Sequence, residues 1–113
     1  MENIVALGNG ACNFVEHFSK YPQYTVYQID SDLRQSNNFF QIAEESSHED
    51  YEKNFPDMRE FFKKISGPVL FVISGGGKIT GCSLALLDQL RAHCDKISIL
   101  YLHPELSFVG TEA

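Results

Sequence analysis

Four short apolar runs divide the chain into alternating segments. They cover residues 4–7, 25–29, 69–74 and 97–102, and the last three are rich in β-branched and aromatic residues. Runs with so little polar alternation are typical of strands buried on both faces, as in a parallel sheet covered by helices. The pattern therefore predicts an α/β domain of three layers, with a mostly parallel sheet and helices on both faces.

Helical spacing of apolar residues fills the segments between these runs. One helix is predicted over 13–20, and a longer one begins near Thr80, with its apolar positions at Leu84, Leu86, Leu87, Leu90 and Cys94. Segments 37–45 and 56–65 can each form a helix, the second with Pro56 in its first turn. The acidic segment 46–50 predicts a solvated loop. We interpret the phenylalanines as core residues, namely Phe14, Phe18, Phe39, Phe40, Phe61 and Phe62.

Composition and charge narrow the class of protein. The chain has 113 residues, 43% of them hydrophobic, which indicates a single domain or part of one. A formal net charge of -6 argues against binding to nucleic acid, which needs clustered Lys and Arg. No apolar run approaches the roughly 20 residues that span a bilayer, and no signal peptide is evident. The chain has three cysteines, an odd number, so we expect free thiols in a reducing compartment. The sequence therefore predicts a soluble cytoplasmic protein without a membrane partner.

A glycine-rich segment from Gly8 to Asn13 follows the first run and opens a helix. Glycine lets a phosphate approach the backbone, and a helix N-terminus presents free N–H donors. The spacing departs from the dinucleotide pattern G-x-G-x-x-G at Asn13, so a tight structural turn is the alternative. Asp30-Ser31-Asp32 ends the second run, where a nucleotide-binding βαβ unit places a carboxylate for a ribose hydroxyl, although the same residues also suit a helix cap.

The strongest feature is the segment 74–83, Ser-Gly-Gly-Gly-Lys-Ile-Thr-Gly-Cys-Ser, between the most apolar run and the clearest predicted helix. Three consecutive glycines cost backbone entropy that a plain turn seldom requires. Successive N–H groups at a helix N-terminus form an anion nest, to which Lys78, Thr80 and Ser83 can add side-chain contacts. The order of residues is not that of a Walker loop. The segment therefore predicts phosphate binding.

Taken in order, these motifs resemble the N-terminal nucleotide-binding half of the tubulin/FtsZ family of GTPases. Residues 75–81 match the family signature GGGTGTG at five of seven positions. Gly8 and Asn13 correspond to its first glycine loop, and Asp30-Ser31-Asp32 to its Asn-Thr-Asp. Segment 103–110 is similar to Thr-Lys-Pro-Phe-x-Phe-Glu-Gly and shares Pro104, Phe108 and Gly110 with it. The resemblance implies that residues 1–113 form a partial, Rossmann-like nucleotide-binding domain of this family.

The resemblance also implies ligands, partners and site residues. The ligand would be GTP or GDP, with Mg²⁺ accompanying the triphosphate. The full-length protein would associate with itself head to tail. The implied nucleotide-binding residues are Gly8, Asn9, Gly10, Ala11, Cys12, Asn13, Asp32, Gly75, Gly76, Gly77, Lys78, Ile79, Thr80, Gly81 and Pro104.

The chain departs from the family at several points. Lys78 and Ile79 replace Thr and Gly of the signature, and the family's Gly-Ala-Gly loop for the γ-phosphate has no counterpart between Asp32 and Pro68. The chain also ends at Ala113, before the family's guanine-stacking helix and its acidic catalytic loop, G-x-N-x-D-x-x-D. We therefore expect nucleotide binding, with hydrolysis only when that loop is supplied, and no catalytic residue is assigned.

Two other functions stay open at this point. One is a small Rossmann-like protein that binds NAD or another adenine nucleotide. The other is an interaction module that keeps the fold, has lost nucleotide binding and regulates or caps a filament, which the departures at Lys78 and Ile79 favour. Reactive thiols are a further possibility, because Cys12 and Cys82 stand at predicted helix N-termini, whereas buried cysteines are commonly inert. The four histidines show no metal-ligand spacing, so no zinc site is predicted.

Overall fold

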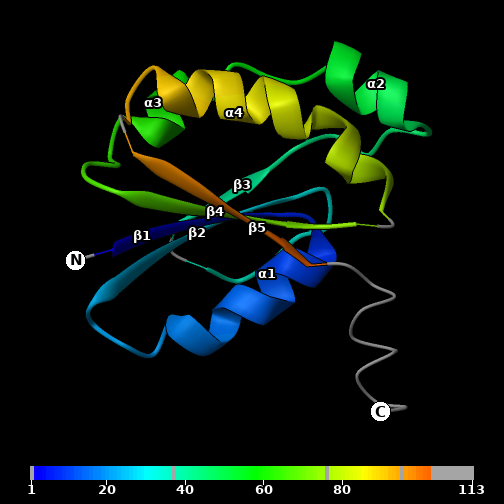
Figure 1. The fold of residues 1–113 in the computed structure, drawn as a ribbon. Helices are drawn as coiled ribbons and strands as arrows, with labels where there is room; N and C mark the ends of the chain where they lie inside the picture. The colour runs from blue at the N-terminus through cyan, green and yellow to red at the C-terminus, as the bar shows by residue number, and fades with distance from the viewer. Residues whose placement is uncertain (1, 37, 76, 95, 103–113) are drawn as a thin grey trace.

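The protein is an α/β domain of Rossmann-like architecture, seen in a computed structural model that describes residues 2–36, 38–75, 77–94 and 96–102. Strands and helices alternate along most of the chain (Figure 1). The strands are β1 (Glu2–Leu7), β2 (Tyr24–Asp30), β3 (Phe39–Gln41), β4 (Val69–Ser74) and β5 (Ile97–Leu102). The helices are α1 (Asn9–Val15), α2 (His48–Lys53), α3 (Arg59–Phe62) and α4 (Ser83–Arg91), with 3-10 turns η1 (Glu16–Phe18) and η2 (Lys78–Cys82).

The five strands form one sheet in the order β3-β2-β1-β4-β5, and every described pairing is parallel. β1 lies at the centre, with Val5 opposite Tyr27 of β2 and Phe71 of β4. The prediction of a parallel sheet from continuous apolar runs is confirmed. β4 and β5 have the predicted bounds, while β1 and β2 are longer than the apolar runs that marked them.

Helices cover both faces of the sheet, which confirms the three layers. α1 lies on one face, and α2, α3 and α4 lie on the other (Figure 1). Each face has its own buried cluster, the smaller one around Ala11, Cys12 and Val15 of α1. The larger cluster includes Phe62, Phe71 and Leu86. Within the described ranges, no helix has the length and apolar character needed to cross a membrane.

The middle of the chain differs from the prediction. Residues 39–41 form strand β3 instead of part of a helix over 37–45, because their backbone extends the sheet: the Gln28 N–H donates to the Asn38 carbonyl at 2.8 Å, and the Ile42 N–H donates to that of Asp30 at 3.0 Å. The predicted loop over 46–50 is also wrong. Ser47 caps α2 by accepting a hydrogen bond from the Asp50 N–H at 3.1 Å, and two acidic residues in the first turn favour the helix dipole.

The remaining helices are shorter than predicted. Of 56–65 only Arg59–Phe62 is helical, because Gln89 of α4 binds the backbone before it, at the Met58 N–H and the Pro56 carbonyl. The predicted apolar side chains there are still buried or half-buried. The first helix starts at Asn9, earlier than predicted, and the last is preceded by the 3-10 turn η2. Leu84, predicted to face the core, is 69% exposed.

Candidate functional site

A cleft of about 1210 Å³ opens at the carboxyl ends of the five strands. In open parallel sheets, ligands bind at this edge, at the point where the strand order reverses. Here the order reverses between β1 and β4, because β2 follows β1 on one side while β4 and β5 lie on the other. Both glycine-rich segments come directly after these two central strands. The topology therefore places them together at the switch point.

The two segments, 8–13 and 74–81, touch each other in two places. Gly8 has φ +91°, which only glycine adopts readily, and a Cβ there would lie 2.8 Å from Cγ2 of Ile79. A Cβ on Gly10 would lie 2.7 Å from the Oγ of Ser74. Both glycines are needed for the close approach of the loops. The tight structural turn that the sequence offered as the alternative for the first segment is therefore present, and it brings this segment against the second one.

The backbone donors of the loops differ in availability. The Gly8 N–H donates to the Ile29 carbonyl at 2.8 Å, and the Gly75 N–H donates to that of Leu102 at 2.9 Å, so both are held in the sheet. In the first turn of α1, the N–H groups of Asn9, Gly10 and Ala11 precede the first helical hydrogen bond, which Cys12 makes to Gly8. These three donors lie free of partners within the helix.

The sequence-predicted residues divide into three groups: those that line the cleft, those that pack or bond within the protein, as Gly8 does, and those outside the described residues. Those that line the cleft are Asn9, Gly10, Asn13, Asp32, Gly75, Gly77, Lys78 and Ile79. Ala11 and Cys12 are fully buried against the sheet, and the Thr80 hydroxyl donates to the Gly77 carbonyl at 2.8 Å. Gly81 packs against α2, where a Cβ would lie 2.1 Å from the carbonyl oxygen of His48. Gly76 and Pro104 lie outside the described residues.

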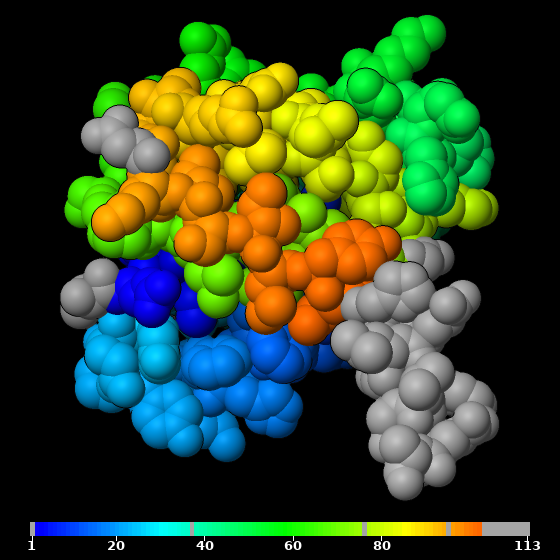
Figure 2. All heavy atoms as spheres, viewed as in Figure 1, coloured from blue at the N-terminus to red at the C-terminus, as the bar shows by residue number. Residues whose placement is uncertain are grey.

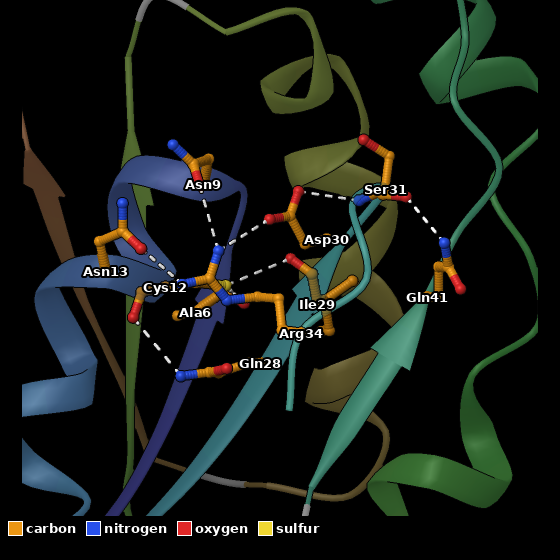
Figure 3. A network of polar contacts seen from close by, with 10 residues as sticks. All are labelled: Ala6, Asn9, Cys12, Asn13, Gln28, Ile29, Asp30, Ser31, Arg34 and Gln41. Atoms are coloured by element: carbon orange, nitrogen blue, oxygen red, sulfur yellow. Dashed lines mark hydrogen bonds and ion pairs between the residues drawn. The ribbon is translucent and has the colours of Figure 1, made fainter. Parts of the chain in front are cut away.

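Arg34 joins the first glycine loop to the end of β2 (Figure 3). Its Nη1 donates to Asn9 Oδ1 at 3.1 Å and to Asp30 Oδ2 at 3.2 Å, and its Nη2 donates to Asn13 Oδ1. The Arg34 side chain is 12% exposed and that of Asp30 is 3% exposed, so the ion pair is largely removed from water. This clamp fixes both asparagines of α1 relative to β2.

The sequence reasoning missed Arg34. The signal available was its isolation, because it is the sole Lys or Arg between Lys20 and Lys53, in a stretch rich in Asp and Glu. An acidic stretch with one basic residue indicates that this residue forms an ion pair, but the sequence does not reveal which carboxylate is its partner.

The acidic residues after β2 have different surroundings. Asp30 is buried, and besides Arg34 its Oδ1 accepts a hydrogen bond from the Ser31 N–H at 2.8 Å. Its carboxylate is therefore engaged within the protein, and the next described element is strand β3, not a helix that it could cap. Asp32 is exposed on the cleft wall. Of the two, Asp32 is the carboxylate that a ligand can reach.

Carboxylates outnumber cations along the cleft. Asp32, Glu44 and Glu45 line it beside the Arg34-paired Asp30, and Lys78 is its one lysine within the described ranges. Lys78 is exposed, and none of the described residues forms an ion pair with it. A free polyanion would meet repulsion on the acidic wall and attraction at Lys78. An anion neutralised in part by a divalent cation fits this charge pattern better.

Within the described part of the chain, no group of three or more His, Cys, Asp or Glu side chains can hold a metal ion. Mg²⁺ commonly takes one or two carboxylates together with phosphate and water oxygens, and the carboxylates that line the cleft are Asp30, Asp32, Glu44 and Glu45. Cys12 and Cys82, the two thiols predicted at helix N-termini, are not activated either. Burial raises the pKa of Cys12 and of Cys82 to about 12, which keeps both thiols protonated and unreactive near neutral pH.

Comparison with known proteins adds no further assignment to this geometry. The chain matches no family model and no curated protein sequence.

Proposed function

We propose that this chain binds a guanine nucleotide, with the phosphates between the two glycine loops, as the nucleotide-binding part of a tubulin/FtsZ-like GTPase. The observation that carries the proposal is the meeting of the two loops at the switch point between β1 and β4, with Lys78 exposed in the same cleft. Phosphates approach glycine backbones closely and accept hydrogen bonds from N–H groups at such edges.

Each cleft residue takes a role in this proposal. The N–H groups of the first α1 turn and of the Gly77–Ile79 backbone donate to phosphate oxygens, and the Lys78 ammonium offsets their charge. Asp32 accepts a hydrogen bond from a ribose hydroxyl, and the Asn13 amide supports the loop through Arg34. Mg²⁺ enters on the phosphates and lowers the repulsion from Glu44 and Glu45. Hydrolysis needs an acidic catalytic loop that a neighbouring subunit supplies in head-to-tail association.

Titration with fluorescently labelled GTP in the presence of Mg²⁺ tests the proposal. Lys78→Glu reverses the one lysine charge in the cleft, within the described ranges, and is expected to weaken binding by at least tenfold. Lys96→Glu is the matched control: it makes the same charge change on an exposed residue before β5, at the opposite edge of the sheet. Absence of GTP binding by the wild type, or equal loss in both variants, would refute the proposal.

The interaction module without nucleotide stays a second candidate, favoured by the acidic cleft wall and by the Gly75 N–H being engaged in the sheet. A ligand that binds only the folded state raises its stability. Thermal denaturation with millimolar GTP and Mg²⁺ distinguishes the two functions. An increase in the melting temperature supports nucleotide binding, and no change supports the module. If ATP or NAD displaces the labelled nucleotide at a lower concentration than unlabelled GTP does, the adenine-nucleotide alternative is favoured instead.

A further inference from the structure

The cleft has two chemically distinct ends. At the glycine loops its wall is largely polar and includes Asn9, Ser74 and Lys78. The lining also includes the apolar side chains of Phe14, farther along α1, and of Leu100 and Leu102 at the end of β5, which the Gly75 N–H ties to the second loop. Both leucines also pack against the buried cluster of the α1 face, so β5 and α1 share this side of the sheet. A ligand that fills the cleft therefore has a polar part at the loops and an apolar part between α1 and β5.

Phe14 is the aromatic side chain at the apolar end. The sequence interpretation placed it in the core, but it is 37% exposed and lines the cleft. Gly10, Asn13, Phe14 and His17 follow one another at helical spacing and all face the cleft. Phe14 lies one turn beyond Gly10, about 6 Å along the helix axis. The loop end and the aromatic end are thus adjacent on one helix.

The Phe14 ring is supported from behind. Its centroid lies 5.8 Å from that of Phe18, which in turn contacts Tyr24 edge-on at 5.4 Å. The row of three rings holds Phe14 in place on one side and leaves part of its surface open to the cleft. On the space-filling surface the atoms of β5, drawn in orange, lie between those of α4 and α1 (Figure 2).

We propose that Phe14 is the platform on which the purine base of a bound nucleotide stacks. The inference rests on the proposed function and adds the place of the base: with the phosphates at the glycine loops and Asp32 at the ribose, the base extends along α1 to Phe14. Stacking depends on ring area and tolerates different bases, so the platform favours purine over pyrimidine nucleotides. Phe14, a residue of this chain, would thereby hold the purine base.

The test compares GTP with inorganic tripolyphosphate, which has the phosphates without the base. Phe14→Leu is expected to weaken GTP binding about tenfold and to leave tripolyphosphate binding unchanged. Tyr21→Leu is the matched control, since Tyr21 is 52% exposed and does not line the cleft. Circular dichroism of each variant checks that the fold is kept.

A second variant provides a direct signal. The chain has no tryptophan, so Phe14→Trp introduces a single one at the platform. We expect the emission of this variant to be quenched by GTP and to be unchanged by tripolyphosphate. Equal binding of GTP and tripolyphosphate by the wild type, unchanged GTP binding by Phe14→Leu, or no quenching would overturn the inference and leave phosphate binding intact. If the wild type binds neither compound, the proposed function itself fails.

Discussion

Gly81 and Gly77 belong to the same glycine-rich segment, but the structure assigns them different roles. A Cβ on Gly81 would lie 2.1 Å from the carbonyl oxygen of His48 and 2.6 Å from its Cα, so Gly81→Ala forces the backbone of α2 away from η2. An ordinary van der Waals contact begins at 3.4 Å, whereas the Cβ would lie 2.1 Å from the His48 oxygen. The start of α2 therefore has to move away by about 1.3 Å. Overpacking of this kind costs about 1–3 kcal/mol. Displacing α2 also loosens Tyr51, which is 5% exposed.

The matched variant is Gly77→Ala. Among the described residues, a Cβ there would meet just one atom, Cγ2 of Ile79, at 3.8 Å, and φ is -95°, which any residue adopts. We expect Gly81→Ala to lower the free energy of unfolding by about 2–3 kcal/mol and Gly77→Ala to leave it within about 0.5 kcal/mol. Urea denaturation followed by circular dichroism measures both. If the two variants have the same denaturation midpoint, the packing argument for Gly81 is wrong.

Three further predictions concern the loops, the clamp and the thiols. Gly8→Ala combines a positive φ with a Cβ 2.8 Å from Ile79 and should cost about 2–4 kcal/mol in urea denaturation, whereas a wild-type midpoint would show that the loop relaxes freely. Arg34→Met leaves the Asp30 carboxylate buried without its partner and should cost about 3–5 kcal/mol, part of which Asp30→Asn restores in the double variant. Burial raises the pKa of Cys12 and of Cys82 from 9.0 to about 12, so the folded state holds these thiol protons more tightly than the unfolded state does. The stability that this difference contributes is therefore complete below pH 9 and declines as the pH rises toward 12. Denaturation midpoints of the wild type, Cys12→Ala and Cys82→Ala are measured between pH 8 and 11. The wild type should lose more stability over this range than either variant, and an equal loss in all three would contradict the prediction.

The sheet was predictable because four of its strands contain continuous apolar runs. β1, β2 and β4 are buried on both faces as predicted, whereas the edge strand β5 is partly exposed, with Ile99 and Tyr101 each 54% exposed. β4 and β5 have the predicted bounds, since Pro68 and Gly75 mark the limits of the first and the apolar run itself those of the second. β3 has three residues, and its existence depends on pairing with β2 rather than on any local pattern. α2 did have a local signal, the Ser47 cap and the acidic first turn, which the charge of the segment obscured. Short elements were therefore missed where long ones were found.

The candidate site was predictable in its position but not in its details. Glycines after two central parallel strands must meet at one edge, and they do. Sequence alone does not reveal that Gly8 has a positive φ, that Gly81 contacts α2, or that Phe14 faces the cleft, because each depends on atoms distant in sequence. The Arg34 clamp is of the same kind, since Asn9 and Asn13 lie more than twenty residues before it.

Gly77 is the position at which packing and ligand binding can be separated. Gly8, Gly10 and Gly81 are each explained by a close contact within the protein, so a module that has lost its ligand would need to keep them. Gly77 has an ordinary φ, room for a side chain and a place on the cleft wall, so nothing in the described fold requires a glycine there. Close approach of the proposed nucleotide to the backbone would give such a reason. Gly77→Ala should therefore keep wild-type stability and weaken GTP binding several-fold in the same titration. A variant that binds GTP as tightly as the wild type would remove this reason and favour the interaction module.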